Sequence, residues 1–263
     1  MSIKKKIGGL FLEFQCYWNY LRLRKQVQSK RKFLIFAQGR SGSTLLASLL
    51  KSHTQIYCFD ELLFDRRLFP KAYIIGRFSQ ATQPIIGCHI KIYQLINEQK
   101  ISDPQQFILD LVQDGWQLIY LRRADTFRHA ASPLIAKERN LWHVGRRPDK
   151  ETEQSTRLKS VKIEPAQVLK AIKNRLESSA REREVLEGLD YLEIVYEEDL
   201  LNAESQQKSQ VKICKFLNVQ LEDLKSPLKK TTTQTIRDAI SNYQEIKNHL
   251  NDNGFGEYIN EEN

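Results

Sequence analysis

The sequence predicts an α/β protein with a P-loop-like three-layer fold, in which helices flank a central parallel sheet. Short apolar runs that suit buried strands alternate along the chain with longer helical patterns, as they do in parallel α/β proteins. The first apolar run leads directly into a glycine-containing turn and a helix. The 263 residues are enough to bury a substantial core, and they suit one large domain better than two small ones.

The expected elements follow one another in a regular order. Residues 10–30 indicate a basic, aromatic-rich helix, so we divide the chain into an N-terminal arm at 1–32 and a main domain at 33–263. Strands are expected at residues 33–37, 56–59, 85–92, 117–121 and 191–195. Helices are expected directly after the first strand and at residues 103–114, 125–141, 165–186, 206–217 and 236–250. Residues 62–84 show no clear pattern, and residues 143–163 are polar enough to form a long loop.

The composition limits the partners and the compartment. The formal net charge is +9, because 41 Lys and Arg outnumber 32 Asp and Glu, and such an excess favours anionic partners. The four cysteines are far apart and form no CxxC pair, which argues against a disulfide framework or a zinc site. No apolar run is long enough to cross a membrane, and no small-residue cleavage site follows the basic N-terminus. We therefore expect a cytoplasmic protein.

The segment FLIFAQGRSGSTLLASLL has the order strand, turn and helix, which creates an anion site. Backbone N–H groups of such a turn point inward, and the helix N-terminus adds unpaired donors and the positive end of its dipole. The candidate ligands in this loop are Arg40, Ser41, Gly42, Ser43 and Thr44. The alternative is a plain strand-to-helix turn with a Ser, Gly or Thr cap.

The loop departs from the Walker A pattern G-x-x-x-x-G-K-[ST]. When Gly42 and Thr44 are aligned on that pattern, Ala37 takes the first glycine position and Ser43 takes the lysine position. The lysine that would reach the β- and γ-phosphates is absent, which argues against an ATP or GTP hydrolase. A P-loop nucleotide or sugar kinase is kept as an alternative function, although it would need the same lysine.

Four segments in one order resemble the PAPS-dependent sulfotransferases, which use 3′-phosphoadenosine 5′-phosphosulfate (PAPS) as the donor. They are RSGSTLL, YLRRADTFRHAASPLIAKERNLWH, EIVYEEDLL and KKTTTQTIRDAISNYQEI, and together they run from about residue 33 to residue 250. The second segment, with its Trp-His continuation, is most like the bacterial carbohydrate branch that includes trehalose 2-sulfotransferase.

This resemblance implies PAPS as the co-substrate, a carbohydrate or glycolipid hydroxyl as the acceptor, and no metal. The glycine-containing loop would hold the 5′-phosphosulfate. Arg122 or Arg123, at a strand end, and Ser132 on the next helix would bind the 3′-phosphate. The family's C-terminal basic loop closes over the donor, which implies a donor contact for Lys229 or Lys230.

Glu61 is the candidate general base, because it follows the second strand and matches the glutamate that carbohydrate sulfotransferases place there. Asp60 is its neighbour, but adjacent residues of an extended segment point to opposite faces, so we expect only one of them to reach the site. Lys91 and His89 are two residues apart and would project from one face. Lys91 would neutralise the transferring group or bind the acceptor, and His89 and His143 would contact the acceptor. The alternatives are a surface carboxylate pair, a structural lysine and an exposed loop histidine.

The N-terminal arm has two interpretations. Its basic residues flank aromatic and leucine residues, at Lys4–Lys6, Arg22, Arg24, Lys25 and Lys30–Lys32. This composition is typical of a helix that lies on an anionic membrane, and equally of a helix that packs on its own domain with a solvated basic face. Beyond the arm, basic residues are not interleaved with stacking aromatics, so we expect no nucleic-acid partner. A non-catalytic anion-binding protein is kept as an alternative.

Overall fold

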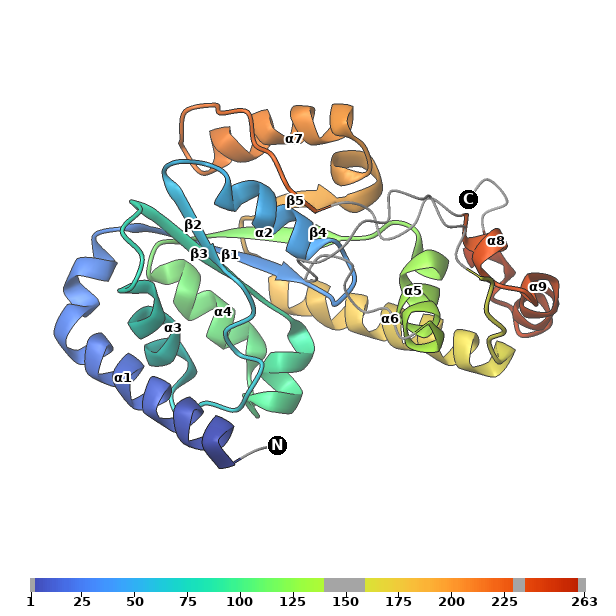
Figure 1. The fold of residues 1–263 in the computed structure, drawn as a ribbon, viewed down its shortest axis with the longest axis horizontal. Coiled ribbons are helices and arrows are strands. Elements are labelled where there is room, and N and C mark those ends of the chain that lie inside the picture. Colours follow the sequence, from blue (N-terminus) through green and yellow to red (C-terminus); the bar gives the residue numbers. More distant parts are fainter. Residues whose placement is uncertain (1–2, 140–158, 229–234, 260–263) are drawn as a thin grey trace. The chain divides into compact units, whose positions relative to one another are not determined.

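The structure is a computed structural model that describes residues 3–139, 159–228 and 235–259 (Figure 1). The chain forms two compact units. The first comprises Met1–Arg122 and Arg181–Ser226, and the second comprises Arg123–Ala180 and Pro227–Asn263. Each unit has a hydrophobic core of its own.

The first unit is built on a five-stranded sheet in which all neighbouring strands are parallel, in the order β2-β3-β1-β4-β5. The strands are β1 Arg31–Ala37, β2 Ile56–Phe59, β3 Ile85–Ile90, β4 Trp116–Arg122 and β5 Leu192–Val195. Their carboxyl ends therefore meet at one edge of the sheet. After β1, the chain places β2 and β3 on one side of that strand and then β4 and β5 on the other side. The direction in which strands are added therefore reverses at β1, next to β4. Ligands of parallel α/β sheets bind at such a point.

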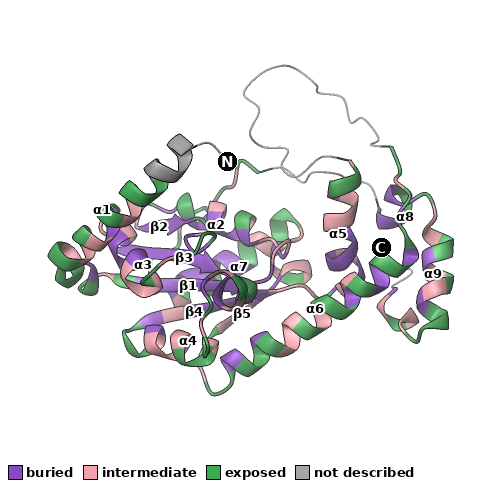
Figure 2. Cartoon of the chain, turned by 90° about the horizontal axis from the view of Figure 1, so that it is seen from below, coloured by how far each residue is buried: buried purple, intermediate pink, exposed green. Residues whose placement is uncertain are grey.

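Helices cover both faces of this sheet, which confirms the predicted three-layer α/β fold (Figure 2). Leu34 and Phe36 of β1 pack toward one layer, and Phe33 and Ile35 pack toward the other, as the alternation of a strand requires. The first layer contains α1 Ile3–Gln28, α3 Pro70–Phe78 and α4 Pro104–Gln113. The second layer contains α2 Ser43–Lys51 and α7 Ala203–Phe216.

The N-terminal helix α1 packs closely on α3. A Cβ added to Gly76 of α3 would lie only 1.9 Å from the carbonyl oxygen of Cys16, so no larger residue fits at this crossing. Cys16 and Val27 of α1 are buried in the core of the first unit. The described part of the arm is thus a packed helix of that unit.

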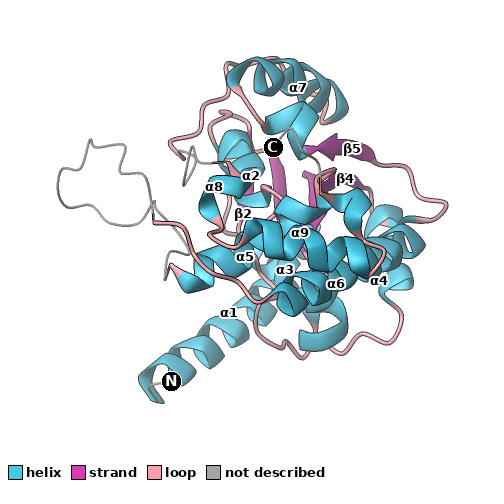
Figure 3. Cartoon of the chain, turned by 90° about the vertical axis from the view of Figure 1, so that its right-hand side faces the viewer, coloured by secondary structure: helices cyan, strands magenta, loops and turns pink. Residues whose placement is uncertain are grey.

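The second unit is helical in its described part (Figure 3). Its core joins α5 and the first part of α6 to the C-terminal helices through Phe127, Val168, Ile172, Ile246 and Leu250. The helices are α5 Thr126–Glu138, α6 Pro165–Leu186, α8 Ile236–Ala239 and α9 Tyr243–Asp252, followed by a 3₁₀ turn at Gly256–Tyr258.

The predicted strands are all present, and most of the expected helices lie within a few residues of their predicted bounds. The single helix expected at 236–250 is wrong. Ile240 leaves the helical path to form a parallel bridge with Val161, and the Asn242 side chain bonds the backbone of Ile163 in both directions, at 2.8 and 3.1 Å. These contacts separate α8 from α9. The strand expected at 85–92 ends at Ile90, and α3 lies in a segment for which the sequence showed no pattern.

Candidate active site

The loop that follows β1 has the shape of an anion-binding turn. Arg40 and Gly42 both have positive φ angles, 68° and 99°, so the chain turns sharply before α2. The first helical bond runs from the Leu46 N–H to the Gly42 carbonyl at 3.0 Å. The N–H groups of Ser43 and Thr44 therefore have no acceptor within the helix, and they lie at the positive end of its dipole.

Two contacts hold this loop in shape. The hydroxyl of Ser41, which is fully buried, donates to the Gln38 carbonyl at 2.7 Å. This hydroxyl therefore closes the loop on itself. The ring of Tyr196 lies against Gly42, where an added Cβ would come within 2.4 Å of it. Gly42 is required both by its φ angle and by this ring.

A buried carboxylate, that of Glu182, accepts a hydrogen bond from the first residue of the loop, Gln38. Glu182 of α6 is completely buried, and its Oε2 accepts from Gln38 Nε2 and from the Tyr120 hydroxyl, each at 3.1 Å. Burial, and after it the charge of Glu182, raises the pKa of Tyr120 well above its usual range. Tyr120 is thus a fixed donor that ties β4, α6 and the loop together.

Glu61 and Lys91 form an ion pair at the carboxyl ends of β2 and β3. Gln94 completes the arrangement: its Nε2 donates to Glu61 Oε2 at 2.7 Å, and its Oε1 accepts from the Lys91 N–H at 2.9 Å. Lys91 Nζ lies 3.8 Å from the position that a Cβ on Gly39 would occupy. The ammonium and the carboxylate therefore stand beside the anion-binding loop.

The adjacent carboxylate of Asp60 points elsewhere, as the extended backbone requires. It bonds Lys51 of α2 at 2.8 Å, and its side chain is 64% exposed against 27% for Glu61. Of the two carboxylates, only Glu61 is beside the loop and the buried Gln94.

His89 lies in β3, in register with Ile35 of the central strand. It is buried, and its Nδ1 has no hydrogen-bond partner among the residues that the structure describes. Burial lowers the pKa of His89 to about 4, against an opposing effect of the Glu61 carboxylate. The imidazole is therefore neutral above that pH, and it is a buried neighbour of the ion pair.

Arg122, at the end of β4, is paired with Glu193 of β5. Its Nε donates to Glu193 Oε1 at 2.8 Å and its Nη2 donates to Oε2 at 3.3 Å, and this pairing raises the pKa of Arg122. Arg123 begins the second unit, and Ser132 lies in α5 of that unit. His143, Lys229 and Lys230 lie outside the described residues.

The structure thus brings together the loop, Glu61, Lys91 and His89 within the first unit. Sequence reasoning missed the residues that position them, Gln38, Gln94, Tyr120 and Glu182, and it also missed Glu193, the partner of Arg122. All are ordinary polar residues whose partner side chains lie at least 33 positions away in the chain, and no local pattern marks them. Asp199 accepts from the Val195 N–H at 2.7 Å and the Ser209 hydroxyl at 2.8 Å, which fits a structural role for the segment after β5.

No group of three or more His, Cys, Asp or Glu residues in the described part of the chain could hold a metal ion. No helix in that part of the chain is both long and apolar enough to span a membrane. All four cysteines are buried free thiols.

No protein-family model and no curated protein sequence matches the chain. Its structure is similar to the crystal structure of a sulfotransferase from Alicyclobacillus acidocaldarius, with a TM-score of 0.52 and 15% identity over 88% of this chain and 93% of that chain. At this identity the likeness shows the fold. A mouse sulfotransferase, SULT7A1 complexed with PAP, matches 76% of this chain and 64% of its own at 14% identity, with a TM-score of 0.40 that is too low for any inference.

Proposed function

We propose that this protein transfers a sulfuryl group from PAPS to a hydroxyl group of a carbohydrate or glycolipid. The observation that carries the proposal is the Glu61–Lys91 ion pair beside Gly39 of the anion-binding loop. A fixed anion site, a cation and a carboxylate at one sheet edge are what in-line transfer of a charged group to a hydroxyl requires.

In this proposal the loop binds the 5′-phosphosulfate of the donor. The N–H groups of Ser43 and Thr44 and the dipole of α2 favour an anion there, and Arg40 adds a guanidinium. Ser43 takes the place of the Walker lysine, and Lys91 supplies an ammonium from the neighbouring strand instead. The Lys91 charge would neutralise the negative charge that develops between the sulfuryl and phosphate groups.

The transfer step balances without a further reactant. The acceptor hydroxyl oxygen forms a bond to sulfur, and the bond between sulfur and the bridging oxygen of the donor breaks. That electron pair leaves with the 5′-phosphate of adenosine 3′,5′-bisphosphate (PAP). The hydroxyl proton passes to Glu61, and the products are the sulfate ester and PAP. Gln94 holds the Glu61 carboxylate in place through its 2.7 Å bond.

For the 3′-phosphate, the ligand in this proposal is Arg123 or Arg122, together with Ser132, and Arg122 is already paired with Glu193. Both contacts of the Arg122 guanidinium go to one carboxylate, so this arginine would have to give up a bidentate partner to bind a phosphate. On the family resemblance alone, Lys229 or Lys230 would contact the donor. His89 and His143 would contact the acceptor.

Two measurements test the proposal. Calorimetric titration with PAP, AMP and ATP should give much tighter binding of PAP, because only PAP carries the 3′-phosphate; equal affinities would contradict a PAPS site. Incubation with sulfur-labelled PAPS and a panel of sugars, glycolipids and phenols should then yield labelled sulfate esters. Label transferred only to phenols would refute the carbohydrate assignment while leaving sulfuryl transfer intact. A chain that binds ATP and phosphorylates a sugar would be a kinase.

A further inference from the structure

The large apolar side chains that the first unit exposes are concentrated on α1 and on the loop before α3. Each of the following is more than half exposed, and together we call them the apolar face: Leu10, Phe11, Phe14, Trp18, Leu21, Phe64, Leu68 and Phe69. A concentration of exposed large apolar side chains of this kind marks an interaction site in natural proteins.

Helix geometry explains how α1 comes to have apolar residues on two opposite sides. At about 100° per residue, the α1 members of the apolar face fall within an arc of about 100°. Cys16 and Val27 lie on the opposite side and are buried in the core with α3. Packing on the first unit needs only that buried side. The packing of α1 on the first unit therefore gives no reason for large apolar residues on the exposed arc. Figure 2 shows exposed residues along α1.

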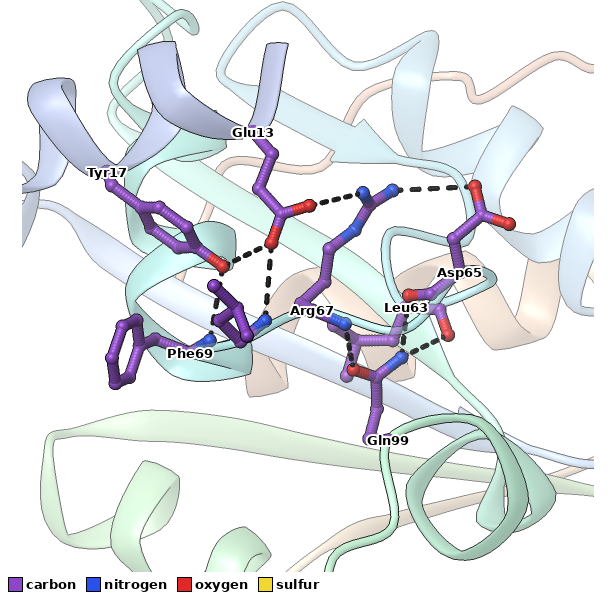
Figure 4. A network of polar contacts seen from close by, with 8 residues as sticks. Glu13, Tyr17, Leu63, Asp65, Arg67, Phe69 and Gln99 are labelled. Atoms are coloured by element: carbon purple, nitrogen blue, oxygen red, sulfur yellow. Dashed lines mark hydrogen bonds and ion pairs between the residues drawn. The ribbon is translucent and has the colours of Figure 1, made fainter. Parts of the chain in front are cut away.

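A polar network fixes the loop on α1 and aligns the two parts of the apolar face (Figure 4). The Glu13 carboxylate accepts from Arg67 Nη1 at 3.1 Å, from the Leu68 N–H at 3.2 Å and from the Tyr17 hydroxyl at 2.5 Å. Tyr17 in turn accepts from the Phe69 N–H at 3.1 Å, and the two rings meet edge to face at 5.7 Å. The exposed Phe69 is therefore held beside the arc.

Gln99 anchors the same loop from its other side. Its Oε1 accepts from the Arg67 N–H at 2.9 Å, and its Nε2 donates to the carbonyls of Leu63 at 2.9 Å and Asp65 at 2.8 Å. A loop that is hydrogen-bonded on both sides presents its apolar side chains in a defined position. Phe64, Leu68 and Phe69 are exposed in spite of that fixed backbone.

The charges that α1 contributes beside the apolar face are almost entirely positive, and the loop adds one exposed carboxylate, Asp65, which is paired with Arg67. Glu13 is the only acidic residue in the sequence of α1, and it is paired with Arg67. Arg22 lies over the Trp18 ring at 5.8 Å, and Arg24 and Lys25 follow in the same turn. The sequence places three more lysines, Lys4–Lys6, near the other end of the helix.

We propose that the apolar face inserts into the interface of an anionic lipid membrane, with α1 lying in the membrane plane. Aromatic and leucine side chains on one arc, flanked by Arg and Lys, are the chemistry of an interfacial helix. Tryptophan favours the boundary between headgroups and acyl chains, and each nearby basic residue is attracted to anionic headgroups. A second copy of the chain fits less well, because two such faces would bring like charges together without a free α1 carboxylate to pair them.

The membrane proposal is independent of the sulfotransferase proposal, and its test uses the full chain and vesicles. The protein should float with phosphatidylcholine vesicles that contain phosphatidylglycerol, bind far less to phosphatidylcholine alone, and detach as salt is raised. The triple variant Phe14→Ser/Trp18→Ser/Leu21→Ser should lower vesicle affinity at least about tenfold, because each side chain contributes buried apolar area in the bilayer. Replacing Arg22, Arg24 and Lys25 by Gln should weaken the preference for anionic vesicles.

The matched control is Val211→Ser/Leu221→Ser, which removes two apolar side chains that are also more than half exposed but lie outside the apolar face. It should bind vesicles as the unaltered chain does. If the triple variant unfolds, Leu10→Ser/Phe69→Ser is the second test of the same face. Equal binding of unaltered and triple-variant protein would overturn the proposal. So would a dimer in sedimentation that the triple variant converts to monomer without any vesicle binding.

Discussion

Lys91 and Glu61 form an ion pair between the ends of two neighbouring strands, and Gln94 bonds both partners. Glu61 and Lys91 are close because the parallel strands β2 and β3 end at the same edge of the sheet. Gln94 reaches both because the turn after β3 brings it back to the Lys91 N–H.

Glu61→Gln should abolish most sulfuryl transfer while PAP binding persists. The amide cannot take the hydroxyl proton, and removing a positioned base typically lowers the rate by about 10²–10⁴-fold. The single amide oxygen cannot accept from both Lys91 Nζ and Gln94 Nε2, so one of these donors loses its acceptor and a stability loss of about 1 kcal/mol is expected. Turnover with labelled PAPS, PAP titration and a thermal melt measure the three effects.

Asp60→Asn is the matched control for Glu61→Gln. Asp60 is exposed and bonds Lys51, away from Gln94, so this variant should keep near-normal turnover. An inactive Asp60→Asn protein beside an active Glu61→Gln protein would mean that the base has been assigned to the wrong carboxylate.

Arg123→Ala should weaken PAP binding, and Arg122→Ala should leave it nearly unchanged. A charge-assisted contact to a phosphate contributes about 2–3 kcal/mol, which corresponds to roughly 30–150-fold in affinity. Arg122 instead pairs with Glu193 in a partly exposed site, where an ion pair contributes about 0–1 kcal/mol to folding. AMP binding should be insensitive to Arg123→Ala, since AMP has no 3′-phosphate. The reverse pattern for the two arginines would assign the phosphate to Arg122.

Arg40→Gly should weaken binding of both PAP and AMP by about 2–3 kcal/mol, because it removes a charge-assisted contact to the 5′-phosphate. Glycine is chosen because Arg40 has a φ angle of 68°, which glycine adopts without strain. Arg40→Ala removes the same guanidinium but keeps a Cβ, so its melting temperature should be the lower of the two. Calorimetry measures the affinities, and unchanged affinity for both nucleotides in Arg40→Gly would remove Arg40 from the donor site.

Much of the fold was predictable, because strands buried on both faces are continuous apolar runs. The run 33–37 and the turn after it identified β1 and the loop directly. The helix α3 was missed because PKAYIIGRF is short and begins without a side-chain cap, although Pro70 at its first turn was an available signal. The break between α8 and α9 was not predictable, because it depends on a contact of Ile240 with Val161, which is remote in the chain.

The sequence was enough to predict several residues of the candidate site, but not which of them form ion pairs with one another. The order of strands and turns indicated that Glu61 and Lys91 lie near one sheet edge. Their ion pair, and the contact of Arg122 with Glu193, depend on which strands are neighbours and on their register. A single sequence does not specify register between strands that are distant in the chain. For the same reason, the sequence does not show which of the two arginines at the end of β4 has Glu193 as its partner.

The free energy of unfolding should depend on pH through His89, because burial lowers the pKa of this residue to about 4. In the unfolded chain this imidazole takes up a proton below about pH 6.5, whereas the folded chain resists protonation until about pH 4. The stability that neutral His89 contributes is therefore fully present above about pH 6.5 and is lost as the pH falls toward about 4, by roughly 3 kcal/mol in total. His89→Gln has no group that titrates in this range, so it should lose less stability on acidification than the unaltered chain does. Urea unfolding of both proteins at about pH 7 and about pH 4.5 measures the difference. If the two free energies of unfolding fall in parallel, the pKa of His89 is the same in the folded and unfolded chains, and the inference that burial keeps this imidazole neutral down to about pH 4 is wrong.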